Sequence, residues 1–287
     1  MEFKPQIIIN NKIYNHVDNQ RGGISAIYRN DSNYLRIGEK EKIKKDIALH
    51  KKMESYNFPI PKILDEGISE NLSYFIEESL GEEHFGNIFK RETEKFGIIQ
   101  DKTFDQFIEI LVQFAHAQLQ TITSFQDWNF FTDGIHLDLL CNELPGQKEK
   151  ILNAYKKVEE RLSVFPFALL HGDLTPFNIF PKGVIDFEAS FMGPVGYDLG
   201  AIVEHSNWFP EPKDFEYYRF YNFTDKQKKR LLDKFDSIYT NSGLPRLSDY
   251  LVDFNFTKGI WFAVRMDRAP KLQKYRYKLI NQIIEEI

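Results

Sequence analysis

Two short acidic motifs in the middle of the chain restrict what it can fold into more than any other feature. The first reads His-Gly-Asp-Leu-Thr-Pro-Phe-Asn over residues 171–178, and the second reads Ile-Asp-Phe-Glu over residues 185–188. Together they supply a carboxylate to orient an attacking hydroxyl, and an amide oxygen and a second carboxylate to hold Mg²⁺ on nucleotide phosphates. This set of groups predicts a phosphoryl-transfer site, and a fold that brings the two motifs together.

Asp173 is the candidate catalytic base, because a carboxylate at this point positions the hydroxyl and accepts its proton late in the transfer. The alternative is an ordinary turn residue, since Asp-Leu-Thr-Pro is also turn chemistry. Asn178 and Asp186 are the candidate metal ligands. One is neutral and one anionic, and Mg²⁺ is usually held by one or two protein oxygens beside phosphates and waters.

A third segment follows the two motifs and reads Gly-Pro-Val-Gly-Tyr-Asp-Leu-Gly over residues 193–200. It resembles a run of methylthioribose kinases, while Ile-Asp-Phe-Glu with Gly-Tyr-Asp resembles segments of choline and ethanolamine kinases. In this order the segments resemble the aminoglycoside phosphotransferase and choline kinase family of small-molecule kinases. Protein kinases carry the related motifs H-R-D-x-x-x-x-N and D-F-G. The resemblance implies a protein-kinase-like fold, with Mg²⁺ and ATP (or GTP) as cofactors.

The resemblance also implies roles for three further polar residues. His171 and Asp198 are expected to brace the catalytic loop, with Asp198 bonding backbone amides of that loop from the start of the next helix. The alternative for both is a helix cap or an ordinary buried polar contact. Glu188 is expected on the metal or substrate side of the cleft, or else as a solvated loop residue.

The nucleotide side of the cleft is expected upstream. Gly23 and Ser25, in Gly-Gly-Ile-Ser over residues 22–25, can donate backbone N–H groups and a hydroxyl to phosphates, although such a segment is also a common hairpin turn. The resemblance places a Lys on the third strand, paired with a Glu on the following helix. Here Arg36 and Asp46 occupy these positions. Arg keeps the positive charge but is not interchangeable with Lys, so the activity could be altered or lost. The alternative is that Arg36 is an ordinary exposed arginine on the surface.

The segment Phe-Pro-Ile-Pro-Lys-Ile-Leu over residues 58–64 resembles one of aminoglycoside phosphotransferases and supports this alignment. Glu77 and Glu78 then fall at the hinge, where their backbone groups, and not their side chains, would meet a purine.

The acceptor wall is expected after residue 198, where carboxylates and aromatic rings are mixed. The candidates are Glu204, Trp208, Glu211 and Tyr217, with Trp261 further on. Carboxylates and aromatic faces suit a cationic acceptor. The alternative is a solvated, partly packed loop.

The composition is that of an ordinary folded protein of 287 residues, 42% hydrophobic and 28% charged. A net charge of −5 gives no indication of nucleic-acid or anionic-membrane binding. No stretch approaches the roughly 18 apolar residues that span a bilayer. Cys141 is the only cysteine, and the N-terminal segment lacks the apolar core of a signal peptide, so a cytoplasmic location is favoured. No feature bears on the oligomeric state.

Hydrophobic periodicity predicts strands first and helices afterwards. Residues 6–17 alternate apolar and polar as one half-exposed strand, and a charged helix is expected over residues 41–56. From residue 104 onward a helical rhythm dominates, interrupted by a short β-rich patch that carries the motifs. This order predicts an α+β, bilobal protein. Residues 1–78 would form a nucleotide-binding lobe with a small antiparallel sheet, and residues 79–287 a larger, mainly helical catalytic and substrate-binding lobe.

The leading interpretation is an ATP-dependent phosphotransferase that moves the γ-phosphate to a hydroxyl of a small molecule, cationic and of aminoglycoside or amino alcohol type. Choline/ethanolamine or methylthioribose-type sugar kinases are the alternatives, since fold does not settle function. A non-catalytic nucleotide-binding pseudokinase is a second alternative, supported by Arg36 alone. A protein kinase is disfavoured, because no A-P-E-type segment follows Asp186.

Overall fold

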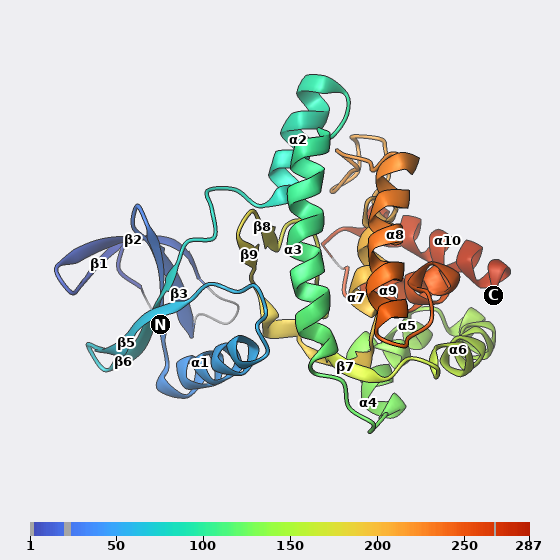
Figure 1. Ribbon diagram of the computed structural model, residues 1–287, viewed down its shortest axis with the longest axis horizontal. Coiled ribbons are helices and arrows are strands. Elements are labelled where there is room, and N and C mark those ends of the chain that lie inside the picture. Colours follow the sequence, from blue (N-terminus) through green and yellow to red (C-terminus); the bar gives the residue numbers. More distant parts are fainter. Residues whose placement is uncertain (1–2, 20–23, 267) are drawn as a thin grey trace.

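A computed structural model describes residues 3–19, 24–266 and 268–287 of the chain. An antiparallel sheet with one helix lies at one end of the molecule, and the mainly helical part lies at the other (Figure 1). The predicted α+β order, a small antiparallel sheet followed by helices, is confirmed. The sheet ends at Glu78; the division of the chain into lobes at that residue stays a prediction.

Among the described residues the N-terminal sheet has the strand order β1-β2-β3-β4-β6-β5, with every neighbouring pair antiparallel. The strands are β1 Gln6–Ile9, β2 Lys12–Asn19, β3 Ser25–Arg29, β4 Asn33–Gly38, β5 Ile63–Ser69 and β6 Leu72–Glu78. Helix α1, Lys40–Ser55, packs on β4 and β6.

The prediction of one strand over residues 6–17 is wrong, because a turn divides it into β1 and β2. Asn10 and Asn11 form this turn with positive φ angles of 51° and 60°. Asparagine tolerates this left-handed backbone, which two-residue hairpin turns require. Because Ile9 pairs with Lys12 across the turn, the inward face passes from odd to even positions: Tyr14 is buried, while Ile13 and Val17 are exposed. The odd-numbered apolar alternation therefore runs on through the turn without following one face of the sheet, and did not reveal it.

Strand alternation decides which side chains face the cleft. Leu35 and Ile37 of β4 lie with Tyr74 and Ile76 of β6 in the apolar cluster on one face of the sheet. Successive side chains point to opposite faces, so the residues between them turn to the other face, against α1. Arg36 lies directly across from Phe75 in the ladder, and Glu77 is the diagonal neighbour. The ladder therefore presents a cation and a carboxylate side by side at the cleft.

The C-terminal part is built around the long helix α3, which stands near the middle of Figure 1. Its helices are α2 Phe85–Phe96, α3 Asp101–Leu119, α4 Trp128–Ile135, α5 Leu137–Glu143, α6 Lys148–Leu162, α7 Tyr197–Val203, α8 Asp225–Asn241, α9 Leu251–Ala263 and α10 Pro270–Glu286. Short 3₁₀ turns occupy Pro145–Gln147, Phe187–Ala189, His205–Trp208 and Leu247–Tyr250.

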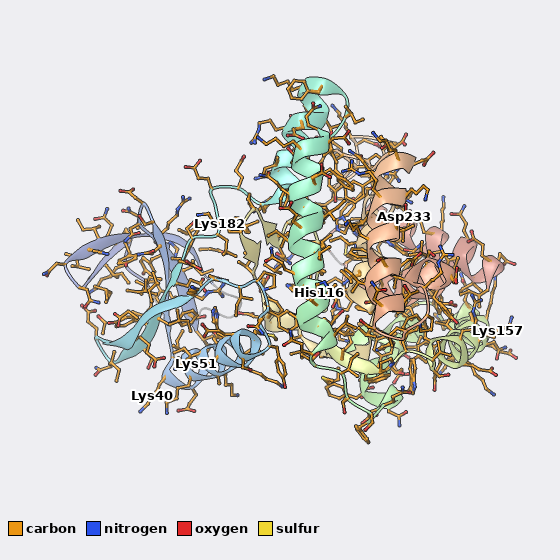
Figure 2. The ribbon with its side chains drawn as sticks, viewed as in Figure 1. Lys40, Lys51, His116, Lys157, Lys182 and Asp233 are labelled. Atoms are coloured by element: carbon orange, nitrogen blue, oxygen red, sulfur yellow. The ribbon has the colours of Figure 1, made fainter. Side chains whose placement is uncertain are left out.

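Phenylalanines at helical spacing hold this part together. Phe104, Phe107, Leu111 and Phe114 follow the i, i+3, i+7 rhythm of α3 and are fully buried. The ring of Phe89 on α2 lies 5.1 Å from that of Phe107, edge to face. Much of the high phenylalanine content therefore forms core. Charged side chains such as Lys40, Lys51, Lys157 and Asp233 project outward (Figure 2).

Short strand pairs carry the motifs. They are β7 Phe167–Leu170 with β10 Phe191–Pro194, and β8 Ile179–Phe180 with β9 Gly183–Val184. The first motif joins β7 to β8, and the second joins β9 to β10, so pairing of the strands brings the motifs together. In the described part of the chain, no helix combines the length and apolar character needed to cross a membrane.

Candidate active site

Asp198, in the first turn of α7, holds the backbone just before Asp173. Its Oδ2 accepts a hydrogen bond from the N–H of His171 at 2.8 Å, and its Oδ1 accepts one from the N–H of Gly172 at 3.0 Å. Gln118 of α3 donates its side-chain N–H to Oδ2 at 3.0 Å. Burial raises the pKa of Asp198, against these donors and the nearby Lys258, which lower it. The carboxylate thus makes the contacts expected of a loop brace.

His171 links the two motifs through both ring nitrogens. Its Nε2 donates to the carbonyl oxygen of Ile185 at 2.8 Å, and its Nδ1 accepts from the backbone N–H of Asp173 at 3.2 Å. Burial lowers the pKa of this imidazole to about 4, so it is neutral at physiological pH. With both nitrogens engaged, His171 has no lone pair to offer an attacking hydroxyl.

The backbone conformation and the surroundings of Gly172 exclude any residue with a side chain at this position. Its φ is +79°, and an added Cβ would lie 2.2 Å from the carbonyl oxygen of Ala189. A left-handed backbone is strained for any L side chain, and here the space is also filled by backbone. The glycine of the first motif is therefore required by the close approach of the two motif-bearing loops.

Asp173 is half-buried and is joined to Asn178. The side-chain nitrogen of Asn178 donates to the main-chain oxygen of Asp173 at 2.8 Å and to its Oδ2 at 3.3 Å. The N–H of Ile185 donates to the main-chain oxygen of Asn178 at 3.0 Å. These bonds fix the Asp173 carboxylate and place the Asn178 amide next to the strand that leads to Asp186.

Asp186 has an exposed side chain and a left-handed backbone, with φ 68° and ψ 55°. Such a conformation costs roughly 1–3 kcal/mol for a residue other than glycine and often marks a functional site. The described residues contain no group of three or more His, Cys, Asp or Glu that could hold a metal. The Asp186 carboxylate and the Asn178 amide oxygen suit Mg²⁺, which takes its other ligands from phosphates and water.

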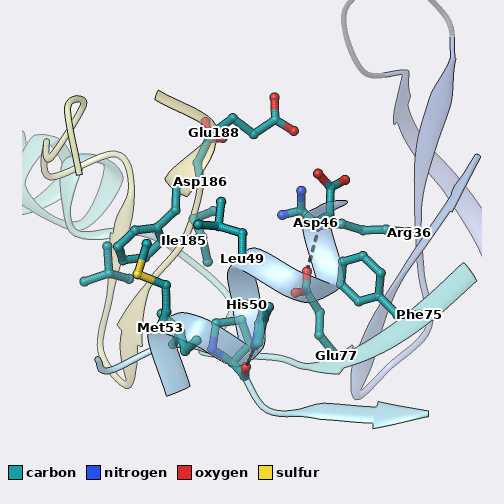
Figure 3. A pocket seen from close by; sticks show the side chains of 14 residues that line it. Arg36, Asp46, Leu49, His50, Met53, Phe75, Glu77, Ile185, Asp186 and Glu188 are labelled. Carbon is teal, nitrogen blue, oxygen red and sulfur yellow. Dashed lines mark hydrogen bonds and ion pairs between the residues drawn. The ribbon is translucent and has the colours of Figure 1, made fainter. Parts of the chain in front are cut away.

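A cavity between the sheet and the second motif brings five of the predicted site residues together. They are Arg36, Asp46, Glu77, Asp186 and Glu188 (Figure 3). Its volume of about 60 Å³ has room for a few water molecules. The walls come from α1, β4, β6 and the segment after β9.

The ion pair of Arg36 differs from the expectation. Its Nε lies 3.1 Å from Oε1 of Glu77, and not against Asp46 (Figure 3). Burial lowers the pKa of Arg36, but Glu77, Asp186 and Asp46 raise it more, so the guanidinium stays charged. The side chain of Glu77 is only 7% exposed and lines the cavity. It therefore has a role in holding Arg36 that the sequence did not indicate; contact of its backbone groups with a purine stays a prediction.

Lys42, in the first turn of α1, was missed. Its Nζ lies 2.9 Å from Asp46 Oδ1 and 3.0 Å from Glu188 Oε1, and so connects α1 to the second motif. Burial lowers the pKa of this lysine, and the two carboxylates more than reverse the effect. The i, i+4 spacing of Lys42 and Asp46 was a usable signal for this pair, whereas the contact with Glu188 joins segments 146 positions apart.

Two other residues predicted to contact the nucleotide use part of their hydrogen-bonding or ladder positions within the sheet, and their contacts with a nucleotide stay predictions. The N–H of Glu78 bonds the carbonyl oxygen of Lys62 at 3.0 Å, so this hinge donor is used within the sheet. Ser25 is fully buried and pairs with Gly38 across β3 and β4. Gly23 lies outside the described residues.

The predicted acceptor residues do not form one wall. Trp208 is 1% exposed and donates to Asn255 Oδ1 at 3.0 Å, as a core residue. Glu204 pairs with Lys228 at 2.9 Å. Glu211, whose side chain is 81% exposed, lies 3.5 Å from Arg219. These carboxylates already have cationic partners in the protein.

Tyr217 lines a second cavity of about 450 Å³, with Phe177 of the catalytic loop in its wall. Its described lining is aromatic and apolar with two arginines and no carboxylate: Phe177, His205, Ser206, Phe209, Tyr217, Tyr218, Arg219, Phe220, Tyr221, Met266, Leu272 and Arg276. Trp261 is not part of this wall, and its ring lies 4.0 Å from Nζ of Lys258.

The fold and this loop geometry place the chain in the class of kinase-like phosphotransferase folds. The model of the phosphotransferase enzyme family matches residues 23–232, and the chain belongs to this family. A choline/ethanolamine kinase family protein from Mesorhizobium loti has the same fold, with a TM-score of 0.60 and 14% identity over 95% of this chain and 88% of that one. The expected protein-kinase-like fold is thereby confirmed.

Two further similarities are more limited. A methylthioribose kinase from Geobacillus thermodenitrificans is 35% identical over 81 residues, which is 27% of this chain and only 20% of that kinase. An aminoglycoside phosphotransferase from Streptomyces rimosus has a TM-score of 0.48 and 13% identity, over 84% of this chain and 92% of that one.

Proposed function

We propose that the protein transfers the γ-phosphate of ATP to a hydroxyl of a small molecule, with Mg²⁺ as cofactor and GTP as an alternative donor. The observation that carries this proposal is the pair of hydrogen-bonded links made by Asn178, to Asp173 and to Ile185, the residue before Asp186. It holds a hydroxyl-orienting carboxylate beside two oxygens of the type that bind Mg²⁺.

In this mechanism Asp173 orients the acceptor hydroxyl and takes its proton as the phosphoryl group is transferred. Asn178 and Asp186 would hold Mg²⁺, which when bound neutralises charge on the phosphates. Arg36 contributes a fixed positive charge to the cleft, since Glu77 holds its guanidinium in place. His171 stays neutral and keeps the loops in register.

The acceptor is proposed to be a small molecule of amino alcohol, aminoglycoside or sugar type. The sequence argument for a cationic acceptor is weakened, because Glu204 and Glu211 pair with the protein's own cations. A methylthioribose-type sugar is the second candidate. It is supported by the cavity whose described lining has no carboxylate and by the 81-residue similarity. A cytoplasmic location and the lack of a nucleic-acid partner stay predictions from composition.

The experiment is a measurement of ADP release from Mg-ATP by purified protein against a panel of aminoglycosides, choline-type amino alcohols and sugars. We expect one acceptor class to stimulate ADP release well above the rate with water. Asp173→Asn protein serves as the matched blank. A wild type that binds Mg-ATP but is stimulated by no acceptor would favour the pseudokinase alternative.

Arg36→Ala is expected to raise the Michaelis constant for ATP and lower turnover together. Loss of a hydrogen bond to a charged group costs roughly 1.5–3 kcal/mol, or about 10- to 150-fold in kcat/KM. Arg36→Lys should retain most activity, because the charge remains opposite Glu77. Steady-state kinetics over an ATP series give both constants.

Arg29→Ala, a change at the end of β3 in the same sheet, is the control and should leave both constants unchanged. Because Arg36→Ala leaves Glu77 buried without its partner, the double variant Arg36→Ala/Glu77→Gln separates this penalty from the lost contact. Wild-type kinetics in both variants would show that Arg36 does not contribute to ATP binding.

A further inference from the structure

A buried lysine on α9, Lys258, contacts the backbone of the catalytic loop. Lys258 is 1% exposed, and its Nζ donates a hydrogen bond to the main-chain oxygen of Gly172. That carbonyl belongs to the peptide unit that leads directly into Asp173. Lysines are almost never fully buried without a partner, so this ammonium and this carbonyl form a specific contact.

Aromatic rings surround the ammonium. Nζ lies 4.0 Å from the ring centroid of Trp261, 4.9 Å from that of Phe262 and 5.3 Å from that of Tyr197. Cations are attracted to the faces of such rings, more so where water is excluded. This arrangement fixes the position of the ammonium on three sides and leaves the Gly172 carbonyl as its hydrogen-bonding partner.

The charges that act on Lys258 come from the loop and from neighbouring helices. Asp173 and Asp198 attract it, and Arg276 of α10 repels it. The charge of Lys258 also acts on two buried histidines, His171 and His205. Burial lowers the pKa of His171 to about 4 and that of His205 to about 3, so both imidazoles are neutral. The lysine is thus a counter-charge to Asp173 and to Asp198.

Packing alone does not require a charge at this position. A buried ion pays a large desolvation penalty, and apolar residues of similar volume often replace one with no loss of stability. Methionine would fill the same aromatic pocket. The charge is best explained by what it touches, which is the backbone of the residue before the candidate base.

We propose that Lys258 is a positioning residue for phosphoryl transfer, whose ammonium fixes the Gly172 carbonyl and thereby the direction of the Asp173 carboxylate, and offsets the charges of Asp173 and Asp198. The inference rests on the proposed function. It adds to that function a residue on α9, outside both motifs, on which the geometry of the base depends.

The proposed role of Lys258 predicts a pH dependence of activity, because it requires the protonated ammonium. Burial lowers its pKa to about 8, against the attraction of Asp173 and Asp198. Activity should therefore fall as pH rises through about 8, when the ammonium is lost. Stability should change in the opposite direction. Between this value and about 10.4, the ordinary lysine pKa, the unfolded chain binds more protons than the folded one, so the free energy of unfolding rises with pH.

The test uses the full chain with Mg-ATP and measures ADP release between pH 6 and 10, with water and with the panel acceptors. Lys258→Met is expected to lower kcat by roughly 10- to 100-fold, because small misplacements of a catalytic group cost up to about 10²-fold. The KM for Mg-ATP should change by less than about threefold, since the lysine acts on the base and not on the nucleotide. The fall in activity near pH 8 should disappear.

Lys258→Arg keeps a cation, so it should recover part of the lost kcat and move the alkaline fall beyond pH 10, since Arg stays protonated. Thr257→Val is the matched control. Thr257 is the buried neighbour on α9, and its hydroxyl donates within its own helix, to the carbonyl oxygens of Asp253 and Phe254. This variant should retain wild-type kcat and the alkaline fall.

The wild-type pH profile needs no variant, so it tests the proposal even if Lys258→Met fails to fold. An active wild type with no fall in activity between pH 7.5 and 9 would overturn it. So would a Lys258→Met protein with wild-type kcat, or one that keeps the alkaline fall. In each case the proposed function stands, because the wild type turns over; a wild type without turnover contradicts the proposed function itself.

Discussion

Asp173→Asn is expected to lower kcat by about 10²- to 10⁴-fold, the usual contribution of a positioned general base. The substitution is isosteric, and the stronger bond from Asn178 goes to the main-chain oxygen of residue 173, which remains. The affinity for Mg-ATP should therefore change little. Single-turnover ADP formation and calorimetric titration with Mg-ATP measure the two effects separately.

Asp233→Asn, on the exposed surface of α8, is the control for this substitution and should behave as wild type. If Asp173→Asn keeps more than about a tenth of wild-type turnover, it lacks even the smallest loss expected for a general base. The assignment of Asp173 would then fail, although the metal site would remain to be tested.

Asp186→Asn is expected to weaken Mg²⁺-dependent ATP binding by at least about 100-fold, since losing a residue that merely supports a metal ligand already costs about 10- to 100-fold. Asparagine tolerates the left-handed backbone at this position, so the change removes the charge and keeps the conformation. Asn178→Ala should weaken binding less, because that ligand is neutral. Calorimetric titration with Mg-ATP measures both.

Titration of the same proteins with ATP in EDTA is the internal control. Without Mg²⁺, wild type and Asp186→Asn should bind ATP about equally weakly, because the carboxylate then has no metal to hold. Equal affinities of the two proteins for Mg-ATP would remove Asp186 from the metal site.

The parts of the site that could be predicted from the sequence are local. Asp173, Asn178 and Asp186 lie within one short segment, and the contacts of His171 with Ile185 span 14 positions. Strand order followed by helical rhythm likewise predicted the α+β architecture. Both signals depend on neighbours along the chain, where residue spacing translates directly into geometry.

Contacts between distant segments could not be predicted in this way. Arg36 and Glu77 are 41 positions apart and meet only because β4 pairs with β6 in one register. Lys258 lies 86 positions from Gly172. Trp208 looked like a ligand-binding aromatic because acidic residues flank it, yet it packs in the core. A one-residue change in register or helix phase moves such side chains to another face.

The most direct measurement is the fate of the γ-phosphate. ATP labelled in this group is incubated with Mg²⁺, the wild-type protein and each acceptor class, and the products are separated. The account predicts label in a phosphate ester of one small hydroxyl compound, formed by wild type and lost in Asp173→Asn. Label that stays in ATP, or appears only as inorganic phosphate at the same rate in both proteins, would contradict it.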